Sequence, residues 1–153
     1  MKIVVQRSKN AKVEVNNEIV GKIDYGLVLL VGFTHNDTIK EIDYMVDKVI
    51  NLRIFDDENG IMNKSLIDVN GSILSISQFT LYADSRKGRR PSYVNALSSE
   101  KAKEMYEIFN NKLKENNINV ETGIFQADMQ VSLINDGPVT IILEKDNENI
   151  KGD

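Results

Sequence analysis

The segment Ser77-Gln78-Phe79-Thr80-Leu81 places three polar side chains at the end of an apolar stretch. Residues 72–81 have the apolar spacing of a buried β-strand. Polar groups in such a position need hydrogen-bond partners within the fold or a ligand. The segment therefore predicts either a set of satisfied strand side chains or one wall of a substrate pocket, and spacing alone leaves both interpretations open.

A Gly-Pro pair lies in a second polar segment, Asn135-Asp136-Gly137-Pro138-Val139-Thr140. It separates two stretches, 129–135 and 139–144, that have the pattern of strands. The residues themselves favour a simple hairpin turn, and the peptide bond before a proline is trans by default. The break is nevertheless conspicuous, because the chain contains only two prolines.

Four cations occur within five residues, at Arg86, Lys87, Arg89 and Arg90. Such a cluster could bind the phosphates of a nucleic acid, although a solvated loop is the usual alternative. The net charge of −4 at pH 7 argues against a protein that coats nucleic acid without specificity. It is compatible with a local patch that docks one end of an RNA, and we expect no DNA partner.

The chain has one histidine and no cysteine. Thiolate chemistry is therefore absent, and a Ser-His-Asp triad would have to use His35. This residue lies in a polar Thr-His-Asn-Asp turn, for which a surface or capping role is the simpler interpretation. A zinc site would have to be built mainly from carboxylates, and we expect neither a metal nor a cofactor.

Two apolar side chains, Phe125 and Met129, lie in the segment Gly123-Ile124-Phe125-Gln126-Ala127-Asp128-Met129. They could stack against a nucleobase, because every base presents a π face. Packing in the hydrophobic core is the simpler alternative.

The apolar pattern predicts one mixed α/β domain over residues 1–144, strand-rich, with two β layers and a helix layer. A capping box at Thr38 and Glu41 begins one helix, and Ser98 to Asn116 forms a second. The expected strands cover 2–7, 11–15, 18–23, 27–33, 52–55, 72–81, 118–122, 129–135 and 139–144. The charged residues 145–153 are expected to form a flexible tail. No membrane span or signal peptide is expected, so we predict a cytoplasmic protein.

The segments 77–81 and 135–140 together resemble the signature pair of the bacterial-type D-aminoacyl-tRNA deacylases, the D-tyrosyl-tRNA deacylase family. Three further segments are also similar to that family: 1–7, 52–55 and 81–93. The resemblance covers residues 1–144 in order. One departure is visible, because Gln126 follows Phe125 where a glycine is expected.

The resemblance implies a homodimer with two active sites at the subunit interface and an aminoacyl-tRNA substrate. It implies that the catalytic pocket is formed by Ser77, Gln78, Phe79 and Thr80. The Gly137-Pro138 pair would be cis, would enter the site of the opposite subunit, and would be steadied by Arg7. Phe125 and Met129 would hold the terminal adenosine. From the cation cluster itself we expect Arg86, Lys87, Arg89 and Arg90 to contact the tRNA.

On this interpretation the enzyme hydrolyses the ester of a D-amino acid or glycine with tRNA and rejects L-aminoacyl-tRNA. Positioning and oxyanion stabilisation can suffice for such an activated ester, with the backbone N–H groups of Phe79 and Thr80 as donors. The alternative is that Thr80 is a nucleophile, which would need an adjacent base. Two other classes stay open: an RNA-binding module without activity, and an esterase that uses His35.

Overall fold

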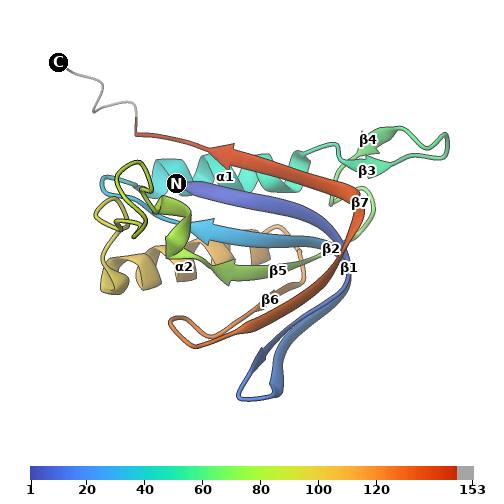
Figure 1. The fold of residues 1–153 in the computed structure, drawn as a ribbon. Coiled ribbons are helices and arrows are strands. Elements are labelled where there is room, and N and C mark those ends of the chain that lie inside the picture. Colours follow the sequence, from blue (N-terminus) through green and yellow to red (C-terminus); the bar gives the residue numbers. More distant parts are fainter. Residues whose placement is uncertain (148–153) are drawn as a thin grey trace.

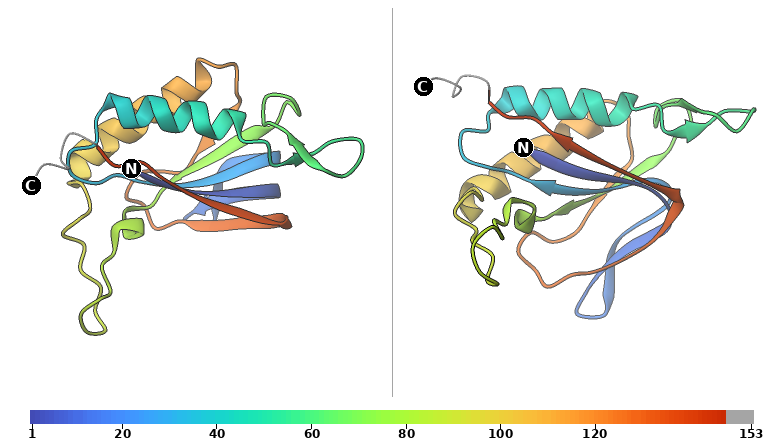
Figure 2. Two further views of the ribbon diagram at one scale, coloured as in Figure 1. Left: turned by 90° about the horizontal axis from the view of Figure 1, so that it is seen from above. Right: turned by 45° about the horizontal axis from the view of Figure 1, so that its top comes forward.

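A computed structural model describes residues 1–147 of the chain. Its main sheet has the strand order β6-β5-β2-β1-β7 (Figure 1). The bounds are β1 (Lys2–Val15), β2 (Glu18–Gly32), β5 (Ser72–Ser77), β6 (Val120–Thr122) and β7 (Gln130–Glu144). Two helices, α1 (Ile39–Asn51) and α2 (Ser99–Lys114), lie on the same side of this sheet (Figure 2). The single mixed α/β domain is thus confirmed.

Strands β1 and β2 form one long antiparallel hairpin that turns at Asn16-Asn17. Both asparagines have positive φ, 51° and 65°, which two-residue hairpin turns favour and asparagine tolerates. The sequence predicted four shorter strands here. The structure joins them into two, because the ladder continues through the intervening polar residues and a register shift between Val13 and Glu14 absorbs the irregularity.

Strand β7 pairs antiparallel with β1 on both sides of the Gly137-Pro138 pair. The ladder changes register there, between the partners of Gln6 and Ser8. The hairpin turn favoured by the residues alone is therefore wrong. The chain does not reverse at Gly-Pro but bulges outward and continues along the same neighbouring strand.

The predicted strand 72–81 is too long at its carboxyl end. Strand β5 ends at Ser77, and residues Phe79–Tyr82 form a short 3-10 helix, η1. The N–H of Gln78 donates to the Val31 carbonyl at 2.8 Å, after which turn bonds replace the ladder, as when Ala83 N–H donates to the Thr80 carbonyl at 3.0 Å. The polar end of the apolar segment is therefore an exposed turn rather than strand.

Helix α1 begins at the predicted capping box. The Thr38 hydroxyl accepts from the Lys40 N–H at 3.2 Å, and the Glu41 carboxylate accepts from the Thr38 N–H at 2.6 Å. Helix α2 follows Ser98, whose side chain makes no capping bond. The two helices cover one face of the sheet, and the core between them includes Ile3, Leu29, Ile42, Met45, Ile73, Phe109 and Leu113.

The other face of the sheet is partly enclosed by the curl of its own strands (Figure 1). A smaller apolar cluster packs inside this curl, formed by Ala11, Val13, Ile23, Val28, Leu74 and Ile76. The second β layer expected from the sequence is therefore not a separate stacked sheet. Because β1, β2 and β7 are long enough to bend, one sheet supplies both sides of this cluster.

A two-stranded hairpin, β3 (Phe55–Asp56) and β4 (Met62–Lys64), projects from the body of the fold (Figure 1). The predicted strand 52–55 is wrong except at Phe55, because Leu52 is the C-cap of α1. Within residues 1–147 no helix is long and apolar enough to cross a membrane.

The first residues of the expected flexible tail are held in place. The Lys145 N–H donates to the Met1 carbonyl at 2.9 Å, and the Asn147 amide donates to the Asn36 carbonyl at 2.7 Å. The remainder of that tail, 148–153, lies outside the described residues.

Candidate active site

A pocket of about 650 Å³ opens where β2 and β5 end. These strands are parallel, so their carboxyl ends meet at one edge of the sheet, where α/β proteins commonly bind ligands. Five of the residues predicted from the sequence line it: Ser77, Gln78, Phe79, Phe125 and Met129. The pocket therefore unites two motifs that lie far apart in the chain.

The floor of the pocket is the transition from β5 to η1. The Gln78 side-chain amide donates to the Thr80 hydroxyl oxygen, so Thr80 belongs to the same cluster although it does not itself line the pocket. The exposed Phe79 ring packs edge-on against Tyr93, with 5.1 Å between centroids. Both interpretations of this segment, satisfied polar side chains and a pocket wall, hold in part. Gln78 and Thr80 are hydrogen-bonded to each other, and they lie beside an open cavity.

Two backbone donors at this floor have no acceptor within the described part of the chain. Phe79 and Thr80 are the first residues of η1, where N–H groups have no partner within the helix. Among residues 1–147, neither N–H donates to another described group. Two adjacent free N–H groups beside a pocket can bind a carbonyl oxygen or an oxyanion.

The opposite wall is a turn at residues 124–127. The Ala127 N–H donates to the Ile124 carbonyl at 3.1 Å. Phe125 and Met129 are half-buried and pack against the core clusters while lining the pocket. Both sequence interpretations of these two side chains thus hold in part, because each presents one side to the core and another to the cavity.

Helix α2 supports the wall and the floor together. The Tyr106 hydroxyl donates to the Ser75 carbonyl on β5 at 2.7 Å, and its ring lies 6.0 Å from that of Phe125. Burial raises the pKa of Tyr106 above its usual value, so it stays a neutral donor at physiological pH. This contact fixes the distance between β5 and the Phe125 turn.

His35 is not among the lining residues of the pocket. Its Nε2 lies 2.6 Å from the Val94 carbonyl oxygen and its side chain is exposed, which confirms the surface role predicted for it. The described residues contain no group of three or more histidine, cysteine or carboxylate side chains placed to hold a metal ion.

Arg7 anchors the Gly-Pro bulge. It is 6% exposed, and its Nε donates to the Asp136 carbonyl at 3.0 Å while Nη1 donates to the Ile54 carbonyl at 2.8 Å. The Gly137-Pro138 peptide bond is cis, as the resemblance implies. On the other side of the bulge, Asn135 Oδ1 accepts from the Val139 N–H at 3.1 Å.

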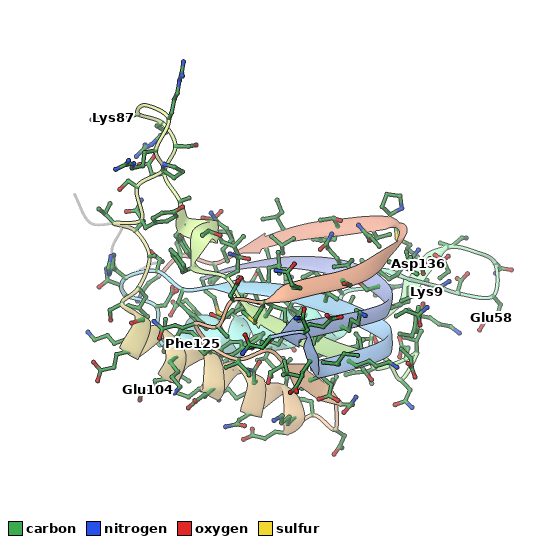
Figure 3. All side chains as sticks on the ribbon, turned by 60° about the horizontal axis from the view of Figure 1, so that its bottom comes forward. Lys9, Glu58, Lys87, Glu104, Phe125 and Asp136 are labelled. Atoms are coloured by element: carbon green, nitrogen blue, oxygen red, sulfur yellow. The ribbon has the colours of Figure 1, made fainter. Side chains whose placement is uncertain are left out.

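The bulge lies away from the pocket of its own chain. Gly137 and Pro138 are exposed and do not line the cavity. Figure 3 shows Asp136 at one end of the sheet and Phe125 toward the other. The register agrees, because Asn135 pairs beside Ser8 near the start of the β2–β5 ladder, whereas the pocket lies beyond its end.

The basic loop projects from the body of the molecule (Figure 2), and Lys87 lies near its tip (Figure 3). Its four cations are not equivalent. Arg86 forms two hydrogen bonds with the Asp84 carboxylate, at 2.9 and 2.7 Å, which lower the pKa of Asp84 to about 2. Lys87, Arg89 and Arg90 have no ion pair among residues 1–147, so they are available to phosphates.

Sequence reasoning missed the part of the pocket wall that comes from the segment leading into α2 and from the first turn of that helix. Tyr93, Ala96, Leu97 and Ala102 line the cavity. The available signal was topological: a parallel pair of strands, β2 and β5, binds ligands at its carboxyl ends, and the loops and helix that follow must surround that point.

The curled sheet and the pocket at its edge define a small α/β protein with a ligand site. A model of the D-Tyr-tRNA(Tyr) deacylase family matches residues 4–144, and the chain belongs to this family. Relatives named D-aminoacyl-tRNA deacylase include one from Anoxybacillus flavithermus, 60% identical, and one from Brevibacillus brevis, 58% identical. Each alignment spans 144 residues, 94% of this chain and 99% of the relative. The resemblance seen in the sequence is confirmed.

Two solved structures have the same fold. One is titled c-Myc DNA unwinding element binding protein, with a TM-score of 0.91 and 41% identity over 96% of this chain and 100% of that one. The other is described as a probable eukaryotic D-amino acid tRNA deacylase, with a TM-score of 0.78 over 93% of this chain and 97% of that one. Its identity of 16% shows the fold alone.

Proposed function

We propose that this protein hydrolyses the ester bond of D-aminoacyl-tRNA and of mischarged glycyl-tRNA, releasing the amino acid and the tRNA. The observation that carries the proposal is the pair of free N–H groups of Phe79 and Thr80 beside a pocket whose opposite wall holds Phe125 and Met129. The amino acid ester would lie against the N–H groups and the terminal adenosine against the apolar wall. Aminoacyl-tRNA is made in the cytoplasm, which is the compartment we propose.

The reaction begins when water attacks the ester carbonyl, and the carbonyl oxygen takes up the developing negative charge. One well-placed donor to that oxygen is worth roughly 10²–10³ in rate. The ribose 2′-hydroxyl of the substrate can orient the water, so no histidine or thiol is required from the protein. Collapse of the tetrahedral intermediate then expels the ribose 3′ oxygen, which takes up the proton lost by the attacking water.

Thr80 is better suited to positioning than to nucleophilic attack. Its hydroxyl oxygen accepts the hydrogen bond of Gln78, which reduces the electron density available for attack. A threonine nucleophile also needs a base, and His35 lies outside the pocket. We therefore assign Thr80 and Gln78 to holding the η1 turn, and with it the two N–H donors, in place.

A homodimer would bring the Gly137-Pro138 bulge of one subunit into the pocket of the other. The bulge is exposed, anchored by Arg7 and remote from its own pocket. Exposed apolar side chains support a subunit contact: Phe79, Ile134 and Ile142 are 55%, 54% and 66% exposed. Rigid backbone of the partner would exclude the side chain of an L-residue, and glycine, which has no side chain, would be accepted.

The tRNA body would be held by the projecting loop. Lys87, Arg89 and Arg90 carry charges that are not neutralised within the described chain. The loop returns to the body at Tyr93, which lines the pocket. Phosphates bound along the loop would therefore lie close to the 3′ end of the same strand.

Incubation with D-tyrosyl-tRNA, L-tyrosyl-tRNA, glycyl-tRNA and a simple tyrosine ester tests the proposal. Hydrolysis of the first and third, with the second spared and the free ester slow, is the expected result. Equal binding of all tRNAs without hydrolysis would instead establish an RNA-binding module. Rapid cleavage of the simple ester would establish a general esterase.

A further inference from the structure

Gln126 has a backbone conformation unusual for its side chain. Seven non-glycine residues have positive φ within residues 1–147, and six of them are asparagine. Asparagine enters the left-handed region readily because its short side chain bonds to the local backbone. The seventh is Gln126, with φ 66°, and a glutamine has no such advantage.

The conformation is imposed by the turn at 124–127. The Ala127 N–H donates to the Ile124 carbonyl at 3.1 Å, so Gln126 is the third residue of a four-residue turn. Positive φ at that position favours glycine. Unfavourable backbone conformations that persist in a folded protein cluster at ligand sites, and the glutamine side chain here lines the pocket while remaining exposed.

The chemistry of the side chain indicates what it would bind. A glutamine amide offers two donor hydrogens and an acceptor oxygen. This matches an adenine edge, which pairs the donor N6 amino group with an adjacent ring-nitrogen acceptor. Phe125 and Met129 on either side of Gln126 supply apolar surface for the face of a base, which would leave its edge available to the amide.

We propose that Gln126 reads the base edge of the 3′-terminal adenosine, and so determines specificity for that nucleoside. The inference rests on the proposed function for its substrate. It assigns the unusual residue a binding role rather than a structural one. A purely structural role would leave base recognition unchanged when Gln126 is replaced by glycine, the residue that the turn itself favours.

The test compares two non-hydrolysable ligands for binding to the full-length protein. One is 3′-D-tyrosylamino-3′-deoxyadenosine, in which an amide replaces the ester. The other is its purine riboside counterpart, which lacks only the N6 amino group. The wild-type protein should bind the adenosine ligand about 10-fold more tightly. In Gln126→Gly the ratio should fall to about 1, and the melting temperature should not decrease, because glycine adopts this φ without steric cost.

Ile124→Ala is the matched control, because Ile124 belongs to the same turn, is 48% exposed and does not line this pocket. It should keep the wild-type ratio. A wild-type ratio near 1, or an unchanged ratio in Gln126→Gly, overturns the proposal. Hydrolysis of D-tyrosyl-tRNA by the wild-type protein is measured separately. Absence of this hydrolysis would refute the proposed function. The binding ratios test base recognition by Gln126 whether or not the protein hydrolyses D-tyrosyl-tRNA.

Discussion

The lining residues of the pocket include the polar side chains of Ser77, Gln78 and Gln126 but no histidine. The donors best placed for an oxyanion are backbone N–H groups, which no substitution except proline removes directly. Deleting one side chain should therefore have a modest effect unless the substitution moves backbone. His35→Ala removes a side chain only, whereas Gly137→Ala should move backbone.

His35→Ala should leave the rate of D-tyrosyl-tRNA hydrolysis within a few-fold of wild type. The imidazole contacts the Val94 carbonyl rather than the pocket, so its loss removes a surface contact only. The measurements are the single-turnover rate with enzyme in excess over substrate, and kcat/KM with enzyme limiting. A loss beyond about 10²-fold, the lower range for removing a general base, would refute this account and favour the esterase.

Gly137→Ala should reduce kcat/KM by about 10²-fold or more, because small displacements of positioning groups have effects of that size. An added Cβ would lie 2.9 Å from Val139 Cγ2 and 3.2 Å from Arg7 Nη2, at a φ of +127°. The bulge would have to move. Circular dichroism should still show a folded protein, since the bulge lies at the surface.

Gly60→Ala is the control for that variant. Gly60 also has positive φ, +74°, but an added Cβ would meet nothing within 4 Å. It should lower the melting temperature slightly and leave hydrolysis unchanged. If both variants lose activity equally, backbone strain in general, and not displacement of the bulge, explains the effect.

Among the elements, the loop between η1 and α2 differs from the sequence-based expectation, because one of its four cations forms an ion pair within the loop. The sequence presents four cations as one patch. The structure removes Arg86 from that patch, because Asp84 lies two residues before it and the loop folds the two side chains together. Such local pairing depends on rotamers that composition does not specify.

Replacing Arg89 and Arg90 with alanine should raise KM for aminoacyl-tRNA and leave the rate at saturation nearly unchanged, since uniform binding is what is lost. The slope of log KM against log salt should decrease by about 1.5, because roughly 0.7–0.9 counterions are released per phosphate contact. Arg86→Ala should change the slope by less than half of the single-site value. An unchanged slope in the double variant would show that tRNA docks elsewhere.

Strand boundaries show how much of the fold the sequence determines. Apolar alternation located the strands of the main sheet, and the Thr38 capping box located α1, whereas β4 was not predicted and the strand 52–55 was wrong except at Phe55. Alternation could not show that 2–7 and 11–15 are one strand, because the intervening polar residues continue the ladder with β2 without an apolar signal. It also could not show that β7 passes through Gly-Pro, since the pairing that carries it past Pro138 comes from β1, distant in sequence.

The candidate site was predictable in its parts and not in its arrangement. Ser77, Gln78, Phe79, Phe125 and Met129 were identified from the sequence, and the structure brings them to one pocket. The turn of η1, which exposes two N–H groups, replaces what the pattern predicted as strand. Apolar spacing cannot distinguish these, because Phe79 and Leu81 fit a strand and a 3-10 turn equally well.

For the whole molecule, the proposed function requires two distant features to form one site. The pocket and the Gly137-Pro138 bulge lie toward opposite ends of the sheet in one chain (Figure 3). A symmetric dimer places each bulge against the partner by the same operation. The account therefore requires a dimer in which every active site takes its pocket from one subunit and its bulge from the other.

Mixing two defective proteins tests this requirement most directly. One carries Gly137→Ala, and the other carries Gln78→Ala with Thr80→Ala. Refolded together in equal amounts, about half of the dimers should contain both chains, and one of their two sites should have an intact pocket facing an intact bulge. The account predicts that hydrolysis of D-tyrosyl-tRNA returns to about one quarter of the wild-type level. If each bulge served its own subunit, every site would keep one defect and mixing would restore nothing, which would contradict the account.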